Sequence, residues 1–219
     1  MPTPLYLAEP SELFPQPWTI VAWVHGDSGD RTEIVDESSA RTLAEFLRAL
    51  HSRELPEAGG CEPSRRELRN GGCEFGDDLI SVIGEDRVRE LEKVWRDALS
   101  AVEWDGPPVW AHNDPHAANV VVTDGALSGV IDFGELAPGD PAIDPAAAWT
   151  LLPAGSAAAF LQLYGDVDDA TVRRARGRAV HFGVFVLAMA LKGRRGLPGG
   201  KPGWLPAGRE ILERVLEAC

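Results

Sequence analysis

Apolar residues recur at two different spacings along this chain, and the spacing separates helical from extended stretches. Leu43, Leu47 and Leu50 lie on one face of a predicted helix over residues 39–52. Residues 57–78 are polar and Gly-rich, and we expect mainly loop there with one short helix. The helical spacing returns at residues 86–102, 146–152, 156–164, 169–192 and 207–217. Most of the chain is therefore expected to be helical.

The extended stretches are short and fall in two places. Residues 18–24 (WTIVAWV) are aromatic and β-branched, and residues 4–7 are a candidate partner strand. Three further apolar runs occupy residues 109–112, 119–123 and 127–132, and Asp124-Gly125 separates the last two. An Asp-Gly step between such runs indicates a β-hairpin. The pattern predicts a helical body that holds one small hairpin, with a strand pair at its N-terminus.

Composition and charge narrow the classes of function. The 219 residues are 44% hydrophobic and 25% charged, as in an ordinary globular protein. The formal net charge of −13 argues against a nucleic-acid partner and is compatible with a cationic ligand. We find neither a signal peptide nor an apolar run long enough for a membrane span. Cys61, Cys73 and Cys219 form no CxxC pair, which favours free thiols in the cytoplasm.

Polar residues are densest around the predicted hairpin. Asp114 follows the first of the three apolar runs, Asn119 begins the second, and Asp132 ends the third. Hairpin pairing places Asn119 and Asp132 near one end, and the loop that carries Asp114 leads into that end. Carboxylate and amide oxygens suit a hard cation such as Mg²⁺. A further carboxylate can accept a proton from a hydroxyl, so these groups suit phosphoryl transfer.

The spacing of these three residues resembles that of protein kinases. The fuller pattern, HNDPHAANVVV followed by GVIDFGELAPGDPAIDPA, is similar to the aminoglycoside and macrolide phosphotransferase family, with its HGDxxxxN, ID and GDPxxD segments. WTIVAWVHG resembles that family's last N-lobe strand and hinge, and AEFLRALH its first C-lobe helix. The resemblance implies an α+β, mainly helical fold: a protein-kinase-like C-terminal lobe at residues 26–219, with residues 1–25 as a remnant of N-lobe strands and hinge.

The resemblance also implies roles for the hairpin residues. Asp114 matches the family's catalytic base. Asn119 and Asp132 match its Mg²⁺ ligands. His112 matches a residue that organises the catalytic loop by hydrogen bonding.

Residues outside the hairpin also match the family's pattern. Asp140 and Asp144 occupy the GDPxxD positions, which are expected to brace the loop and the N-terminus of the following helix. Val24, His25 and Gly26 correspond to the hinge, whose backbone would lie against the base of ATP or GTP.

The acceptor contacts and the departures from the pattern concern five residues. Glu135 is the best candidate for an acid that contacts a cationic acceptor, and Trp149 is expected to line the pocket, although a core position is the commoner fate of such a Trp. Asn113 stands where the family usually has Gly, and Pro145 where it has an aliphatic residue. His116 is expected to pack within the loop more readily than to act directly.

Three functions stay open on the sequence alone. The first is a Mg²⁺-dependent phosphotransferase that moves the γ-phosphate of ATP or GTP to a hydroxyl of a small cationic molecule. The second is an inactive, N-lobe-truncated kinase-like domain that binds a ligand or a partner, because no lysine precedes the expected hinge. The third is a two-metal hydrolase built on His112, Asp114, His116, Asp132 and Asp140. The edges of the N-terminal strand pair are open to self-association.

Overall fold

The computed structural model describes residues 1–55, 73–165 and 167–217. The helices are α1 (Ser39–His51), α2 (Asp77–Ile83), α3 (Glu85–Ser100), α4 (Ala147–Thr150), α5 (Ser156–Tyr164), α6 (Asp169–Arg194) and α7 (Leu205–Glu217), with 3₁₀ turns η2 (Ala117–Asn119), η3 (Asp144–Ala146) and η4 (Pro202–Trp204). The strands are β1 (Pro4–Ala8), β2 (Trp18–Val21), β3 (Asp27–Ser28), β4 (Val109–Ala111), β5 (Val120–Thr123), β6 (Ala126–Val130) and β7 (Ala137–Gly139). The predicted mainly helical α+β architecture is confirmed.

The predicted hairpin forms between β5 and β6. Thr123 pairs with Ala126 across a two-residue turn, in which Asp124 has φ 51° and Gly125 has φ 78°. Positive φ at both turn residues matches the right-handed twist of the flanking strands, which explains the Asp-Gly step in the sequence. The hairpin therefore has a fixed register, and this register places the residues before β5 beside those after β6.

Two strands were not expected from the sequence. β3 pairs with β5, and β7 pairs with β4, both antiparallel. β3 has only two polar residues and β7 contains Pro138, so neither has an apolar alternation that marks a strand. Their pairing is set by the strands that they meet. The predicted loop over residues 57–78 falls partly outside the described residues, and its last residues begin α2.

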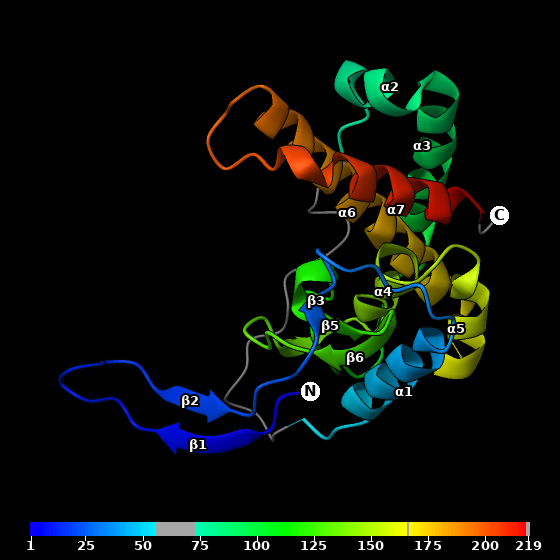
Figure 1. The fold of residues 1–219 in the computed structure, drawn as a ribbon. Helices are drawn as coiled ribbons and strands as arrows, with labels where there is room; N and C mark the ends of the chain where they lie inside the picture. Colours follow the sequence, from blue (N-terminus) through cyan, green and yellow to red (C-terminus); the bar gives the residue numbers. More distant parts are fainter. Residues whose placement is uncertain (56–72, 166, 218–219) are drawn as a thin grey trace.

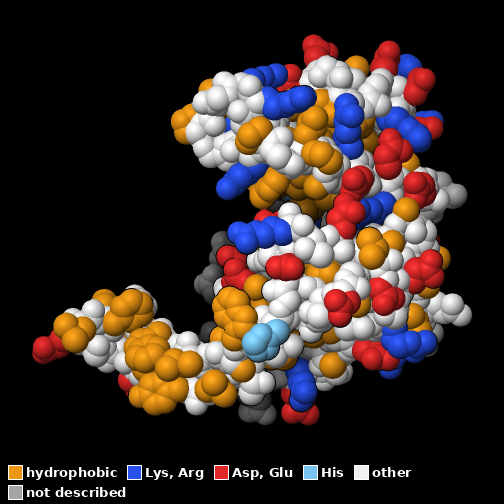
Figure 2. Space-filling view, in the orientation of Figure 1, with side chains coloured by type: hydrophobic (Ala, Val, Ile, Leu, Met, Phe, Trp, Pro, Cys, Tyr) orange, Lys and Arg blue, Asp and Glu red, His pale blue; other side chains and the backbone are white. Residues whose placement is uncertain are grey.

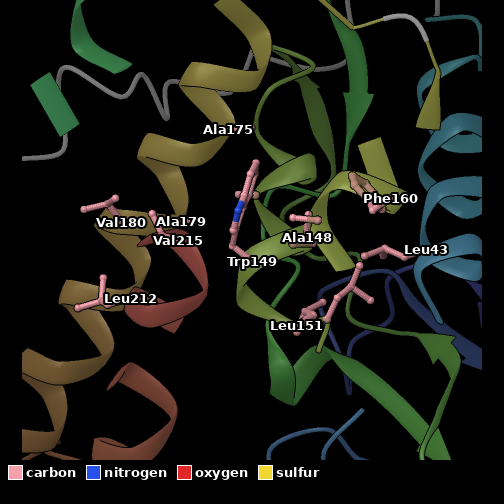
Figure 3. Packing of buried hydrophobic residues seen from close by; sticks show 14 of the residues in the cluster. Leu43, Ala148, Trp149, Leu151, Phe160, Ala175, Ala179, Val180, Leu212 and Val215 are labelled. Carbon is pink, nitrogen blue, oxygen red and sulfur yellow. The ribbon is translucent and has the colours of Figure 1, made fainter. Parts of the chain in front are cut away.

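The core lies where the helices pack around the hairpin (Figure 1). Trp149 is 2% exposed, and Figure 3 shows it between the small residues of α6 and the side of the core that contains Phe160. Helices α6 and α7 pack closely at two glycines: a Cβ on Gly183 would lie 2.6 Å from Leu212, and one on Gly208 would lie 2.7 Å from Leu187. Within the described residues, no helix is both long and apolar enough to cross a membrane.

The N-terminal strands form a separate ribbon. β1 and β2 pair antiparallel in a sheet of their own and project away from the helical body (Figure 1). Figure 2 shows that hydrophobic side chains cover much of this ribbon and its loop. The exposed ones are Leu5, Tyr6, Leu7, Leu13, Phe14, Trp18, Ile20, Val21 and Trp23. The ribbon thus presents an apolar surface that the described residues leave uncovered.

Candidate active site

The loop between β4 and β5 is anchored by one buried carboxylate. Asp144, at the start of η3, has no exposed surface. Its Oδ2 accepts a hydrogen bond from the His112 N–H at 2.8 Å, and its Oδ1 accepts one from the Asn113 N–H at 3.0 Å. Hydrogen bonds from two consecutive amides to one ionised group are strong and directional. They fix the backbone immediately before Asp114.

His51 and Tyr164 hold the Asp144 carboxylate in place. His51, at the end of α1, places Nε2 2.9 Å from Asp144 Oδ2 and Nδ1 2.5 Å from the Tyr164 hydroxyl. Burial raises the pKa of the Tyr164 hydroxyl, and the nearby carboxylates of Asp144 and Asp140 raise it further. Tyr164 therefore keeps its proton and donates to Nδ1, while Nε2–H donates to Asp144. The network joins α1 and α5 to the candidate active-site loop.

Asn113 explains a departure from the family pattern. Its φ of 67° lies in the left-handed region, where Gly is easiest to place and Asn is among the best-tolerated alternatives. Its side-chain amide donates to the carbonyls of Ala111 at 3.1 Å and Glu135 at 2.9 Å. The residue thus meets the same backbone requirement as Gly and ties the loop to the segment after β6.

His112 joins the loop to the end of β6. The ring is fully buried and lies 4.9 Å from the Phe133 ring, centroid to centroid. The Asp114 N–H donates to Nδ1 at 3.3 Å, and because a backbone amide can only donate, the ring proton is on Nε2. Nε2–H donates to the Ile131 carbonyl at 2.9 Å. Both ring nitrogens are engaged by the backbone.

Asp114 and Asn119 are brought together as the sequence predicts. The Asn119 side-chain amide donates to the Asp114 carbonyl at 3.0 Å and to Asp114 Oδ2 at 3.1 Å. His116 Nε2 lies 3.3 Å from the same carboxylate oxygen. Asn119 is buried, whereas about a third of the Asp114 side chain is exposed. The carboxylate is held in place but accessible.

Asp132 lies beside Asn119 at the same end of the hairpin. The Ile131 N–H donates to the Asn119 carbonyl at 2.9 Å, so Asp132 directly follows the last backbone contact between the two segments. Asp132 is exposed, has φ 59°, and accepts a hydrogen bond from the Gly134 N–H at 3.3 Å. Because the Asn119 amide nitrogen bonds Asp114, its Oδ1 is the atom available to a cation. An amide oxygen and a carboxylate fit Mg²⁺, which retains water as its other ligands.

Asp140 anchors the loop to the longest helix. Arg174 of α6 donates from Nε to Asp140 Oδ2 at 2.9 Å and from a terminal nitrogen to Oδ1 at 3.1 Å. The Arg174 side chain is 7% exposed, and it also donates to the Val102 carbonyl. The Ala142 N–H donates to Asp140 Oδ1 at 2.8 Å. This bidentate pair fixes the segment before η3 against α6.

The expected hinge segment packs against the β5–β6 hairpin. The Thr123 hydroxyl donates to the His25 carbonyl at 3.3 Å. A Cβ on Gly26 would lie 2.6 Å from the Val122 carbonyl, and one on Gly129 would lie 2.6 Å from Val24. The two glycines therefore permit this close approach, which the sequence pattern did not reveal.

The two expected acceptor contacts differ in their placement. Glu135 is exposed beyond the end of β6, in a position to meet solvent or a ligand. Trp149 is a core residue, and with 2% of its surface exposed it has no face to offer a substrate. Its expected role in the pocket is therefore wrong. Its hydrophobic area is buried against α6 and α7 (Figure 3).

The arrangement argues against a two-metal hydrolase. Both nitrogens of His112 bond to backbone groups, His116 Nδ1 accepts from the Ala118 N–H, and Asp140 pairs with Arg174. Within residues 1–55, 73–165 and 167–217, no group of three or more His, Cys, Asp or Glu side chains could hold a metal ion. The sequence suggested this alternative only because alternation along an extended segment would place the histidines together.

Sequence reasoning missed three groups that shape the site. His51 and Tyr164 hold Asp144, and Arg174 holds Asp140. The only signal for His51 was its position at the end of the family-like AEFLRALH segment. Arg174 lies 34 residues from Asp140 along the chain, and nothing in its spacing indicated a buried partner.

Solved structures show which fold the chain has. The chain aligns with the GDP and kanamycin complex of APH(2")-IIia with a TM-score of 0.61 and 19% identity, covering 98% of this chain and 75% of that one. A spectinomycin phosphotransferase in complex with ADP and spectinomycin aligns with a TM-score of 0.59 and 16% identity, covering 94% and 72%. The fold is therefore that of kinase-like small-molecule phosphotransferases.

Sequence comparison then gives the family. Residues 1–178 match the model of the phosphotransferase enzyme family APH, and the chain belongs to that family. It is 28% identical over 152 residues to an aminoglycoside 3'-phosphotransferase of Escherichia coli, covering 63% of this chain and 53% of the relative. The chain thus spans about half the length of this curated relative.

Proposed function

We propose that this chain carries the catalytic site of a Mg²⁺-dependent phosphotransferase that moves the γ-phosphate of ATP or GTP to a hydroxyl of a small cationic molecule. One observation carries the proposal. The loop after β4 and the β5–β6 hairpin gather Asp114, Asn119 and Asp132 at one end. The Asn119 amide donates to Asp114, and the Asn119 carbonyl accepts from the N–H of Ile131, the residue before Asp132. Oxygen donors and a separate, accessible carboxylate are what phosphoryl transfer requires.

Asp114 would serve as the base. The hydroxyl of the acceptor would donate a hydrogen bond to the Asp114 carboxylate and pass its proton to it as the oxygen attacks the γ-phosphorus. The bond from that phosphorus to the bridging oxygen would break, and the nucleoside diphosphate would leave. The loop that carries Asp114 is fixed by Asp144 and His112 before the acceptor arrives. Because the base is positioned in advance, little reorganisation would be needed in the transition state.

Asn119 and Asp132 would hold the metal. A Mg²⁺ ion bound there would neutralise the charge of the nucleotide phosphates. Asn119 would contribute Oδ1, because its amide nitrogen is engaged by Asp114. Asp132 is exposed at the end of the hairpin, where phosphates can approach it.

The nucleotide base would lie against residues 24–26. These residues run beside β5 and the start of the candidate site, as the hydrogen bond from Thr123 to the His25 carbonyl indicates. The solved structures of the same fold include GDP and ADP complexes, which supports a nucleotide as the donor. Residues 1–25 would then correspond to N-lobe strands and hinge, with 26–219 as the catalytic lobe.

A cationic acceptor is the best match to the charge of the chain. The net charge is −13, and Glu135 is an exposed acid a few residues beyond Asp132. On the face shown in Figure 2, the surface is hollowed between the upper α6–α7 part and the body below it. Solved structures with the same fold contain bound kanamycin, gentamicin or spectinomycin. These are the acceptors to test first.

The apolar N-terminal ribbon favours a second candidate function. A kinase-like domain that binds a ligand or partner without catalysis would also present such a surface, and a second copy of the chain could pair with its strand edges. Leu13 is 97% exposed and Trp23 is 81% exposed, so covering them would be favourable. A concentration-dependent dimer in solution, combined with no phosphate transfer, would favour this alternative.

A transfer assay tests the proposed function. The purified chain is incubated with Mg²⁺, radiolabelled ATP or GTP, and kanamycin, gentamicin or spectinomycin, and label on the acceptor is measured. Asp114→Asn is expected to lower the rate by about 10²–10⁴-fold. Asp124→Asn, at the opposite end of the same hairpin, should leave the rate unchanged because Asn also tolerates its positive φ. An equal effect of the two substitutions would contradict the role of Asp114.

A further inference from the structure

His116 is held in one protonation pattern by the loop that carries it. The residue caps η2, and its Nδ1 accepts a hydrogen bond from the Ala118 N–H at 3.1 Å. A backbone amide can only donate, so the neutral ring carries its proton on Nε2. Nε2 lies 3.3 Å from Asp114 Oδ2. The ring therefore places its Nε2–H beside the carboxylate proposed as the base.

The plane of the His116 ring is also fixed from outside the loop. It stacks on Phe182 of α6, with centroids 6.0 Å apart and planes 19° apart. Phe182 in turn contacts Phe185, with 6.3 Å between the ring centroids. A residue that only filled space within the loop would need neither the cap nor the position of Nε2 beside Asp114. The cap and the stack together limit the ring to one orientation.

We propose that His116 is a positioning residue that sets the rotamer of Asp114. His116 and Asn119 lie at the two ends of η2. Asn119 donates a hydrogen bond to Asp114 Oδ2 at 3.1 Å, and His116 Nε2 lies 3.3 Å from the same oxygen. The hydrogen bond from Asn119 and the adjacent His116 ring together restrict the side-chain rotamer and the rotation of the carboxylate. The orientation of the Asp114 carboxylate then sets the direction in which it meets the acceptor hydroxyl. The inference rests on the proposed function, because it takes Asp114 as the base.

Two substitutions separate the cap from the contact with Asp114. In His116→Asn, the side-chain oxygen takes the place of Nδ1 and keeps the cap, because Asn is a favoured N-cap residue, but the side chain is too short to reach Asp114. In His116→Gln, the side-chain amide nitrogen takes the place of Nε2 and keeps a donor to Asp114, while the cap is lost. Neither change introduces a charge.

The kinetic test compares these two variants in the transfer assay. We expect His116→Asn to lower kcat by roughly 10²-fold, as a small misplacement of a reacting group does, with the KM for the nucleotide and the melting temperature unchanged. His116→Gln is expected to keep most of the wild-type kcat although it loses the cap. If His116→Gln has the lower kcat of the two, the residue acts through loop stability and the inference is overturned.

A second measurement does not depend on activity. Crystal structures of the wild-type chain and both variants give the position of Asp114 directly. We expect one Asp114 rotamer in the wild type and in His116→Gln, and a different rotamer or several in His116→Asn. An unchanged Asp114 in His116→Asn overturns the inference. A wild-type chain that transfers no phosphate would contradict the proposed function, and the rotamer comparison would still decide the role of His116.

Discussion

Among the described residues, the β1–β2 and β5–β6 hairpins each pair a strand of four residues with one of five, but their surroundings are opposite. In the β5–β6 hairpin, Val120 and Val122 are each 1% exposed. In the β1–β2 hairpin, Ile20 is 48% exposed and Val21 is 45% exposed. β-Branched residues favour a strand in both places. Only the first hairpin is covered by helices and tied to them by hydrogen bonds.

The difference shows what positions the candidate site. Strand propensity alone produces a two-stranded ribbon, which is marginal on its own. The β5–β6 hairpin is fixed because the buried Asp144 and the largely covered Asp140 tie the loops around it to α1, α5 and α6. The N-terminal hairpin has apolar surface without such anchors. Disturbing the anchors should therefore affect stability far more than disturbing the ribbon.

The largest effect is expected from Asp144→Ala. It leaves the His112 and Asn113 amides and the His51 ring buried without their acceptor, and we expect a loss of about 5 kcal/mol in the free energy of unfolding. Denaturant unfolding measures it. Asp144→Asn, which retains one acceptor oxygen, should lose less, and the exposed Asp105→Ala should change little. A loss no larger than that of Asp105→Ala would show that the loop has another anchor.

The next effect concerns the largely covered ion pair of Arg174 and Asp140. Arg174→Met removes the partner of Asp140, which is only partly exposed, and should lower the free energy of unfolding by about 3 kcal/mol. Arg194→Met, at the exposed end of the same helix, is the matched control. Comparable unfolding curves for the two variants would mean that water replaces the guanidinium at no cost.

A pair of valines tests the comparison directly. Val122→Ala in β5 should lower the free energy of unfolding by roughly 2 kcal/mol, because two buried methyl groups are lost. Val21→Ala in β2 should change it by less than about 0.5 kcal/mol. If the two values agree, the N-terminal ribbon is covered in solution, and a second copy of the chain is the first partner to look for.

The smallest effect is on the pH dependence of stability and concerns His181 of α6. His181 stacks on Trp95, and burial lowers the pKa of His181, with Arg178 lowering it further. The pKa of His181 is therefore lower in the folded chain than the unfolded value of 6.5, so the unfolded chain binds a proton more readily. The stability that the neutral ring contributes above pH 6.5 is lost as the pH falls through the folded pKa. Unfolding measured at pH 7 and pH 5 should show a smaller acid loss for His181→Phe than for the wild type. An equal loss would contradict this.

Much of the site could be predicted from the sequence because its signals are local. Asp124-Gly125 fixed the hairpin register, and that register places Asn119 beside Asp132. The partners of the anchors could not be predicted, because they are distant along the chain: His51 and Asp144 are 93 residues apart. Trp149 was misplaced because a Trp near a motif has the same pattern whether it faces a pocket or the core.

The reactivity of Cys73 is a second property that the sequence alone could not predict. The sequence predicted free cysteines, and Cys73 is free among the described residues. Burial raises the pKa of the Cys73 thiol to about 12, so it should react slowly with alkylating reagents in the folded chain. The burial that makes it inert depends on contacts with the core, which spacing alone does not reveal.

The most direct test of the central claim is calorimetric binding of ATP or GTP to the wild-type chain in the presence and absence of Mg²⁺. The account predicts Mg²⁺-dependent binding that Asp132→Ala abolishes and Asp124→Asn, at the other end of the hairpin, leaves intact. Absence of binding, or binding that is unchanged by Asp132→Ala, would contradict a metal–nucleotide site at the end of the β5–β6 hairpin.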